Sequence, residues 1–300
     1  MKTYNDLVQA LAQHSGLMMS QLTQIIKTAP LRYKKFYIKK RNGALREVAQ
    51  PAREVKLIQR WLVNQLEQTL PISSASTAYQ KDASIKKNAA LHINSKYLLK
   101  MDFKDFFPSI TALDIKKHLI KYCGNDYDQE AIDLIVQACT WSSDRTSNLK
   151  LCIGAPSSPL LSNSIMYDFD CIIETHTSSS AITYSRYADD LIFSCNEKNV
   201  LSNYPELVEK TTRELTYPKL LINNNKTIHA SKSGKRMVTG IIITPDNKLS
   251  VGRNRKRLIR AMYHRFTKGE LNEEEILKMF GLINFTNDVE SGFARKFKRK

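Results

Sequence analysis

Hydrophobic residues return at helical spacing over the first part of the chain. The positions that would share one face are Leu7, Leu11, Leu22, Ile25 and Ile26. Residues three or four apart lie on the same side of a helix, and Pro30 cannot continue a helix because it has no backbone N–H. The pattern therefore predicts helices within residues 1–30, with these side chains facing a core.

Three other segments have the pattern of β-hairpins. Residues 32–51 form a basic run, RYKKFYIKKRNGALREVAQP, in which Asn42-Gly43 favours a tight turn between two strands. Residues 182–194 predict a second hairpin with charged residues at its tip. Residues 238–252 predict a third, and Pro245-Asp246-Asn247 would form its turn.

Helices and a short apolar strand fill the middle of the chain. Residues 54–70 predict a helix, and residues 97–103 (YLLKMDF) predict a strand that runs into an aspartate. Thr111 and Asp114 have the spacing of a capping box at a helix start, and another helix is predicted from Pro159. The side chains that the first and last of these helices would bury are Val55, Ile58, Leu62, Leu66, Leu161, Ile165, Phe169 and Ile172. This order predicts a mixed α+β body between a basic hairpin and a basic helical tail.

The composition is that of a folded, strongly basic protein. Of 300 residues, 42% are hydrophobic and 25% are charged, which is ordinary for globular chains of about two domains. Lys and Arg number 46 against 29 Asp and Glu, for a net charge of +17. Such an excess favours binding to a polyanion, with nucleic acid as the first candidate. A passive RNA-binding protein or a merely solvated basic surface would have the same charge.

Several classes of protein are not expected. No uncharged apolar run reaches the roughly 18 residues of a membrane helix, and the N-terminal MKTYNDLVQA has no signal-peptide core. The five cysteines are an odd number without Cys-x-x-Cys spacing, which argues against a disulfide framework and a zinc site. We therefore expect reduced thiols in a cytoplasmic protein that does not contact membranes.

Three aspartates are the candidates for chemistry. Asp102 ends the predicted strand, whereas Asp189 and Asp190 are at the tip of the second hairpin, in TYSRYADDLIFS. Adjacent carboxylates repel each other, and a divalent cation removes that cost. Phosphoryl transfer uses two Mg²⁺ ions about 4 Å apart, held by oxygen ligands. Two aspartates in a turn are also ordinary turn residues, so this motif alone does not decide between the two interpretations.

Four segments together resemble the palm motifs of reverse transcriptases: MDFKDFFPS, IGAPSSPLLSN, YADD and LLINNNKT. The resemblance covers nearly the whole chain. It implies that Asp102, Asp189 and Asp190 are catalytic and that they bind two Mg²⁺ ions together with the Phe103 carbonyl, with Mn²⁺ as a substitute. One departure is Ile153, where the family commonly has Gln.

The same resemblance implies a site for a deoxynucleoside triphosphate. The Phe107 ring would lie under the sugar and exclude a 2′-OH, and Gly154 would let the backbone approach the new base pair. Arg46, assisted by Lys39 or Lys40, would bind the triphosphate, which suits a planar guanidinium. Lys226 would protonate the departing pyrophosphate; a surface lysine is the alternative.

Two short signatures narrow the resemblance to bacterial retron reverse transcriptases. They are Asn88-Ala89-Ala90-Leu91-His92 and Val238-Thr239-Gly240. Each is weak alone, since Asn88 could cap a helix and His92 could be a core histidine. The residues assigned to RNA binding are Asn88, Ala89, His92, Val238, Thr239, Gly240, Arg253, Arg255, Lys256 and Arg257. Tyr263 and Phe266 would face the core of the tail, with stacking on bases as the alternative.

The implied fold is a right-hand polymerase with four parts. Residues 1–30 would be an N-terminal helical segment, 31–95 the fingers, 96–250 an antiparallel palm that includes part of the fingers, and 251–300 a basic helical thumb. The last residues, 296–300, would contact phosphate or lie in solvent.

The implied activity is synthesis of branched RNA–DNA (msDNA). A cognate noncoding RNA would prime from the 2′-OH of an internal guanosine, and dNTPs would extend it. An antiphage role with a separate effector protein is implied as well. No room is left for a nuclease domain, so a host ribonuclease H would remove the template. A group II intron or diversity-generating reverse transcriptase, or a non-catalytic RNA-binding scaffold that restrains an effector, are the alternatives.

Overall fold

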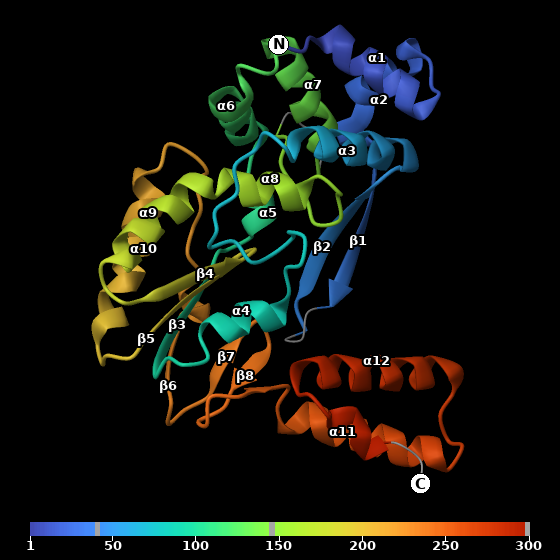
Figure 1. Ribbon diagram of the computed structural model, residues 1–300. Helices are drawn as coiled ribbons and strands as arrows, with labels where there is room; N and C mark the ends of the chain where they lie inside the picture. The colour runs from blue at the N-terminus through green and yellow to red at the C-terminus, as the bar shows by residue number, and fades with distance from the viewer. Residues whose placement is uncertain (40–42, 144–147, 298–300) are drawn as a thin grey trace.

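The computed structural model describes residues 1–39, 43–143 and 148–297 (Figure 1). It is a mixed α+β structure whose central element is a four-stranded antiparallel sheet in the order β4-β5-β3-β6. The strands of this sheet are β3 (Tyr97–Asp102), β4 (Thr183–Tyr187), β5 (Asp190–Cys195) and β6 (Ile228–Ser231). The predicted strand over 97–103 and the predicted hairpin over 182–194 are thus confirmed, and they are neighbours in one sheet.

Helices cover one face of this sheet. Leu99 and Met101 of β3 and Phe193 of β5 are buried there among apolar residues of the helices. The same core extends through α5 (Phe106–Ser109), α6 (Ala112–Cys123), α7 (Gln129–Cys139), α8 (Ser158–Ile165), α9 (Tyr167–Ser178) and α10 (Tyr204–Glu214). Of these, α6 and α7 lie farther from the sheet, beside the N-terminal helices (Figure 1). The Thr111–Asp114 capping box is present at the start of α6, as predicted.

The opposite face of the sheet packs on a second, smaller sheet and one helix. Strand residues alternate between faces, so Leu98 and Ile192 lie on this side, with Ala89 and Val238. The elements involved are α4 (Ile85–Leu91) and the three-stranded sheet of β7 (Arg236–Val238), β8 (Ile241–Ile243) and β9 (Leu249–Ser250). Asp102 shares this face with Leu98.

The N-terminal helices and the first hairpin form as predicted. Helices α1 (Tyr4–Ser15), α2 (Met19–Thr28) and α3 (Arg53–Leu66) pack beside α7 at the top of Figure 1. Strands β1 (Tyr33–Lys39) and β2 (Leu45–Pro51) form a two-stranded hairpin. Its base is held by the segment before α8, because the Ala49 N–H donates to the Ile153 carbonyl at 2.9 Å. Asn42 of the predicted turn lies outside the described residues.

Three sequence-based expectations need correction. The helix predicted over 54–70 ends at Leu66. The helix predicted from Pro159 is interrupted at Met166, whose ψ of 0° turns α9 relative to α8; Ile172 is therefore exposed and Ile173 is buried in its place. The hairpin predicted over 238–252 is confirmed with its turn at residues 244–248, but it begins at Ile241 of β8; Val238 belongs to β7, which Thr239-Gly240 joins to β8.

The C-terminal region is a pair of helices, α11 (Arg253–Thr267) and α12 (Glu273–Val289). Tyr263 and Phe266 pack against the small core that these helices share, which agrees with the core-facing expectation. The pair lies at the lower right of Figure 1, beyond the small sheet. The Lys86 ammonium of α4 contacts Asp288 of α12 at 3.3 Å and so connects this region to the body.

All five cysteines are free and four of them are buried, as expected for reduced core thiols. Within the described ranges, none of the helices has both the length and the apolar character needed to cross a membrane.

Candidate active site

The three predicted aspartates meet at one end of the central sheet. Asp102 is the last residue of β3 and lies directly opposite Asp190, the first residue of β5. Asp189 is in the two-residue turn between β4 and β5, and its carbonyl accepts a hydrogen bond from the Phe103 N–H at 3.2 Å. Antiparallel pairing thus brings together carboxylates that are almost ninety positions apart in the sequence.

Two lysines neutralise part of this negative charge. The Lys226 ammonium lies 2.7 Å from Asp102 Oδ1, and the Lys100 ammonium lies 2.8 Å from Asp190 Oδ1. Lys226 was predicted as a site residue, whereas Lys100 was not. Lys100 and Asp102 are two residues apart and therefore lie on the same face of β3. This spacing is the feature of the sequence that could have identified Lys100 as a site residue.

Asp189 pairs with no lysine among the described residues, and its pKa lies above the ordinary value for an aspartate. Burial, followed by the negative charges of Asp102 and Asp190, raises its pKa to about 6. Burial also raises the pKa of Asp190, although Lys100 opposes that rise. The site therefore has excess negative charge that a cation would relieve.

The donor set has the chemistry of a magnesium site. Carboxylate oxygens and a backbone carbonyl are the ligands that Mg²⁺ prefers. Among residues 1–39, 43–143 and 148–297, however, no three His, Cys, Asp or Glu side chains are arranged to hold a metal ion. Asp102 and Asp190 each pair with a lysine, whereas Asp189 pairs with none among the described residues.

Replacing Asp189 with Asn will stabilise the metal-free protein, and the gain will grow as the pH rises. The folded-state pKa of about 6 is above the value of about 3.9 for an unfolded aspartate. Folding stability therefore falls with rising pH between these two values, and Asn removes this loss. Thermal denaturation in EDTA should show a small difference near about pH 4 and the full difference above about pH 7. A difference that does not vary with pH would contradict the raised pKa.

Two of the predicted nucleotide residues, Gly154 and Arg46, lie on the loop before α8 and on strand β2. Gly154 has a φ of +113°, and a side chain there would place its Cβ 2.9 Å from the Ala49 carbonyl oxygen. Only glycine allows this close approach between the loop and β2. Arg46 is exposed on β2, three residues before Ala49.

Lys39 does not share a face with Arg46. The register pairs Ile38 with Arg46 and Lys39 with Leu45, and neighbouring residues of a strand point to opposite faces. The expectation that Lys39 assists Arg46 at one phosphate is therefore not supported. Lys40, its alternative, lies outside the described residues.

Phe107 is partly buried at the start of α5, next to two other rings. Its ring centroid lies 5.5 Å from that of Phe106 and 6.5 Å from that of Tyr79. Phe103 and Phe106 are buried core residues, in agreement with the sequence-based expectation.

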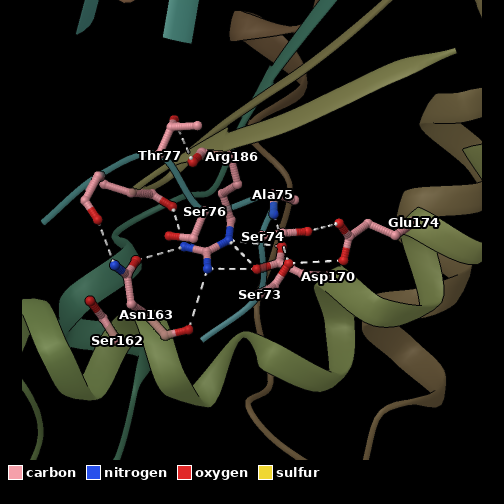
Figure 2. A network of polar contacts seen from close by, with 12 residues as sticks. Ser73, Ser74, Ala75, Ser76, Thr77, Ser162, Asn163, Asp170, Glu174 and Arg186 are labelled. Atoms are coloured by element: carbon pink, nitrogen blue, oxygen red, sulfur yellow. Dashed lines mark hydrogen bonds and ion pairs between the residues drawn. The ribbon is translucent and has the colours of Figure 1, made fainter. Parts of the chain in front are cut away.

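Sequence reasoning missed a buried ion pair that supports the turn between β4 and β5 (Figure 2). Arg186 of β4 and Asp170 of α9 are both fully buried, with Arg186 Nη2 2.7 Å from Asp170 Oδ2. The same guanidinium donates to the carbonyl of Ala188 and to the side-chain oxygen of Asn163, each at 3.2 Å. Ala188 has a left-handed φ of +56°, and it directly precedes Asp189. Arg186 therefore fixes the backbone that carries Asp189.

The first of the two short signatures lies inside the protein. Asn88, Ala89 and His92 are each fully buried. The His92 ring lies 2.8 Å from the Ser185 hydroxyl and 2.7 Å from that of Ser194, and burial lowers its pKa to about 4. This burial corrects the expectation that the three side chains contact RNA directly. They tie α4 to both strands of the β4–β5 hairpin instead.

The second signature lies against the first. Val238 is buried in the same cluster as Ala89, and the Thr239 hydroxyl donates to the Ile85 carbonyl at 3.2 Å. Gly240 is exposed. Of these three residues, only Thr239 and Gly240 are accessible to a ligand.

A basic groove runs from this turn to the start of α11. Its volume is about 1270 Å³, and no Asp or Glu lines it among the described residues. Its cations are Lys100, Lys235, Arg253, Arg255 and Lys256. Lys256 also pairs with Glu290, and Arg255 lies over the Phe285 ring, so these two hold α11 to α12 as well. Arg257 is exposed outside the groove lining.

Comparison with known proteins agrees with the sequence-based resemblance. Residues 38–243 match the reverse transcriptase (RNA-dependent DNA polymerase) family. The chain is 39% identical over 279 residues to the retron Ec83 reverse transcriptase of Escherichia coli, covering 92% of this chain and 89% of the relative. It is 34% identical over 304 residues to the retron Ec73 reverse transcriptase of Escherichia coli, covering 98% and 94%.

Among solved structures, the fold is similar to two telomerases. The TM-score is 0.53 at 12% identity to apo telomerase from Candida Tropicalis, over 90% of this chain and 59% of that one. It is 0.51 at 15% identity to telomerase from Candida albicans with a fragment of telomeric RNA, over 88% and 56%. The chain thus spans less than two thirds of either telomerase chain, and the likeness concerns the fold alone.

Proposed function

The chain belongs to the retron reverse transcriptases, and from this premise we propose that it synthesises branched RNA–DNA from a cognate noncoding RNA. The observation that carries the proposal is the meeting of Asp102 and Asp189 at one end of the sheet, with an excess of negative charge. An RNA template is the partner that family membership implies.

We divide the chain as a right-hand polymerase. Residues 31–95, with the β1–β2 hairpin, would be the fingers, and residues 96–250 would be the palm around the central sheet. Residues 251–300, with α11 and α12, would be the thumb. Residues 1–30 would be a helical segment that buttresses the fingers and palm.

The side chains act on the nucleotide in distinct ways. Arg46 would bind the triphosphate through its guanidinium, and Phe107 would exclude a 2′-OH by contact with the sugar. Gly154 would allow close approach of the backbone. Lys226, which pairs with Asp102 in the absence of a metal, would donate a proton to the departing pyrophosphate.

Asp102, Asp189 and the Phe103 carbonyl would hold Mg²⁺, with Asp190 held nearby by Lys100. When bound, the metal would increase the acidity of the priming hydroxyl and neutralise charge on the leaving group. The protein residues would orient this hydroxyl and the α-phosphate toward each other.

The basic groove gives the RNA–DNA product a path away from the carboxylates. Its five cations and the exposed turn at Thr239-Gly240 would contact backbone phosphates, which is typical of recognition of A-form duplexes by charge and shape. The first DNA linkage would form on the 2′-OH of an internal guanosine. A separate effector in antiphage defence and a host ribonuclease H would act with the product.

A denaturing gel of nucleic acid from cells tests this function. The cells would carry the gene with its native upstream DNA, either unchanged or with Asp189→Asn. We expect a short DNA that requires Asp189 and that migrates faster after ribonuclease treatment, because a branched RNA is removed. If no such DNA forms while RNA remains bound to the purified protein, the result would contradict the proposal. It would favour a non-catalytic RNA-binding scaffold or an intron-type polymerase.

A further inference from the structure

Tyr79 has a backbone conformation that its side chain disfavours. Its φ is +60°, in the left-handed region that suits glycine or asparagine. A bulky residue remains in such a conformation only when its surroundings impose it, and such residues gather at functional sites. Tyr79 is also 48% exposed, so burial of its ring does not explain the conformation.

The conformation is imposed by the network around Arg186 (Figure 2). The hydroxyls of Ser73 and Ser74 donate to the Glu174 carboxylate of α9 at 2.9 and 2.8 Å. Further along, the Thr77 N–H donates to the Arg186 carbonyl at 2.8 Å. These contacts hold residues 73–77 along the outer edge of β4.

The last contact fixes the residue before Tyr79. The Asn163 amide of α8 donates to the Ala78 carbonyl at 2.7 Å, and Ala78 itself is fully buried. The chain must therefore turn outward directly after Ala78. The left-handed turn directs the Tyr79 ring away from the core.

The ring is directed toward the predicted nucleotide residues. Its centroid lies 6.5 Å from that of Phe107, at an angle of 52° between the ring planes. Burial raises the pKa of its hydroxyl; the negative charge of Asp189 raises it further, and the positive charge of Arg46 lowers it. Among the described residues, no side chain or backbone group hydrogen-bonds that hydroxyl. Tyr79 thus presents an exposed aromatic surface beside Phe107, where the charges of Asp189 and Arg46 both influence it.

We infer that Tyr79 is a nucleotide-binding residue whose ring, together with Phe107, forms an aromatic wall for the sugar and base of the incoming dNTP. This rests on the proposed polymerase function, within which it assigns a contact. An aromatic ring that meets a base contributes to binding through stacking, which tolerates any of the four bases. The backbone strain at Tyr79 is retained because it places that ring.

Tyr79→Asn gives a test in which stability and affinity move in opposite directions. Asn accepts the left-handed conformation, so the melting temperature should stay the same or rise. The KM for a dNTP should rise about 5- to 100-fold, as stacking contributions of aromatic rings suggest, with little change in kcat. Extension of a DNA primer on an RNA template, with one dNTP varied, measures both constants.

Two control variants and the unaltered protein define the result. Tyr79→Phe keeps the ring and should leave KM within about twofold, and Asp82→Asn, at another left-handed position of the same loop, should leave KM unchanged. An unchanged KM in Tyr79→Asn, or a fall in melting temperature together with kcat, would overturn the inference and indicate a structural role. An unaltered protein that extends no primer would instead overturn the proposed function.

Discussion

Asp189→Asn will lower DNA synthesis by the purified protein by about a thousandfold or more and leave RNA binding nearly unchanged. The carboxylate that it removes is the one whose pKa is raised to about 6 by burial and by its acidic neighbours. Metal ions contribute several kcal/mol to transition-state stabilisation, and each 1.4 kcal/mol is a factor of about ten in rate. Steady-state primer extension in Mg²⁺ measures the loss.

RNA binding provides the internal comparison. The cations of the groove between β7–β9 and α11 are untouched by the substitution, so the dissociation constant for RNA should change by less than about twofold. Asp133→Asn is a matched control, since this acid pairs with Lys116 on the exposed surface of α7. If RNA affinity falls in parallel with activity, the carboxylate also organises the RNA site, and our separation of the two functions is wrong.

The carboxylates could be predicted because their positions follow from local rules. A strand ending in Asp and a hairpin with Asp-Asp at its tip are each visible in the sequence, and antiparallel pairing supplies the rest. Only one of the two lysine partners of these carboxylates was predicted. Lys226 is part of a recognised motif, whereas Lys100 is defined by the register of β3.

The sequence did not predict correctly which of these residues are buried. His92 and Asn88 looked like polar residues available to RNA, but they lie between α4 and the catalytic hairpin. The core alternative was correct for His92, because the Ser185 and Ser194 hydroxyls on the buried strands β4 and β5 pair with its two ring nitrogens. The prediction that Ile172 is buried was wrong for a different reason. A break at Met166 shifts the helical phase, and hydrophobic periodicity does not reveal such a break.

The two retron signatures are one structural unit. Residues 88–92 and 238–240 are about 150 positions apart, yet Ala89 and Val238 share a cluster and Thr239 bonds to Ile85. Sequence order cannot show this contact, because it depends on how β7 and β8 pack under the central sheet. Through these contacts, α4 connects the Thr239-Gly240 turn to the β4–β5 hairpin.

Arg186→Met will unfold the protein at a lower temperature and abolish detectable DNA synthesis. It leaves the Asp170 carboxylate buried without its partner, which costs about 3–5 kcal/mol of folding free energy. For a chain of this size, that corresponds to a fall of roughly 6–15 °C in melting temperature. Differential scanning calorimetry measures this change. Lys121→Met, which removes a partly exposed partner of Asp168, should cost less than about 1 kcal/mol.

A triple variant separates stability from positioning. Arg186→Met combined with Asp170→Leu and Tyr184→Phe replaces the buried ion pair and the hydroxyl that donates to it with apolar side chains, and such replacements commonly restore much of the stability. Synthesis should nevertheless remain about a hundredfold below normal, because the Ala188 carbonyl has lost its donor and Asp189 is no longer held in place. If synthesis recovers together with the melting temperature, Arg186 contributes only to stability and does not position Asp189. Stability without synthesis would show that the buried guanidinium sets the position of the catalytic aspartate.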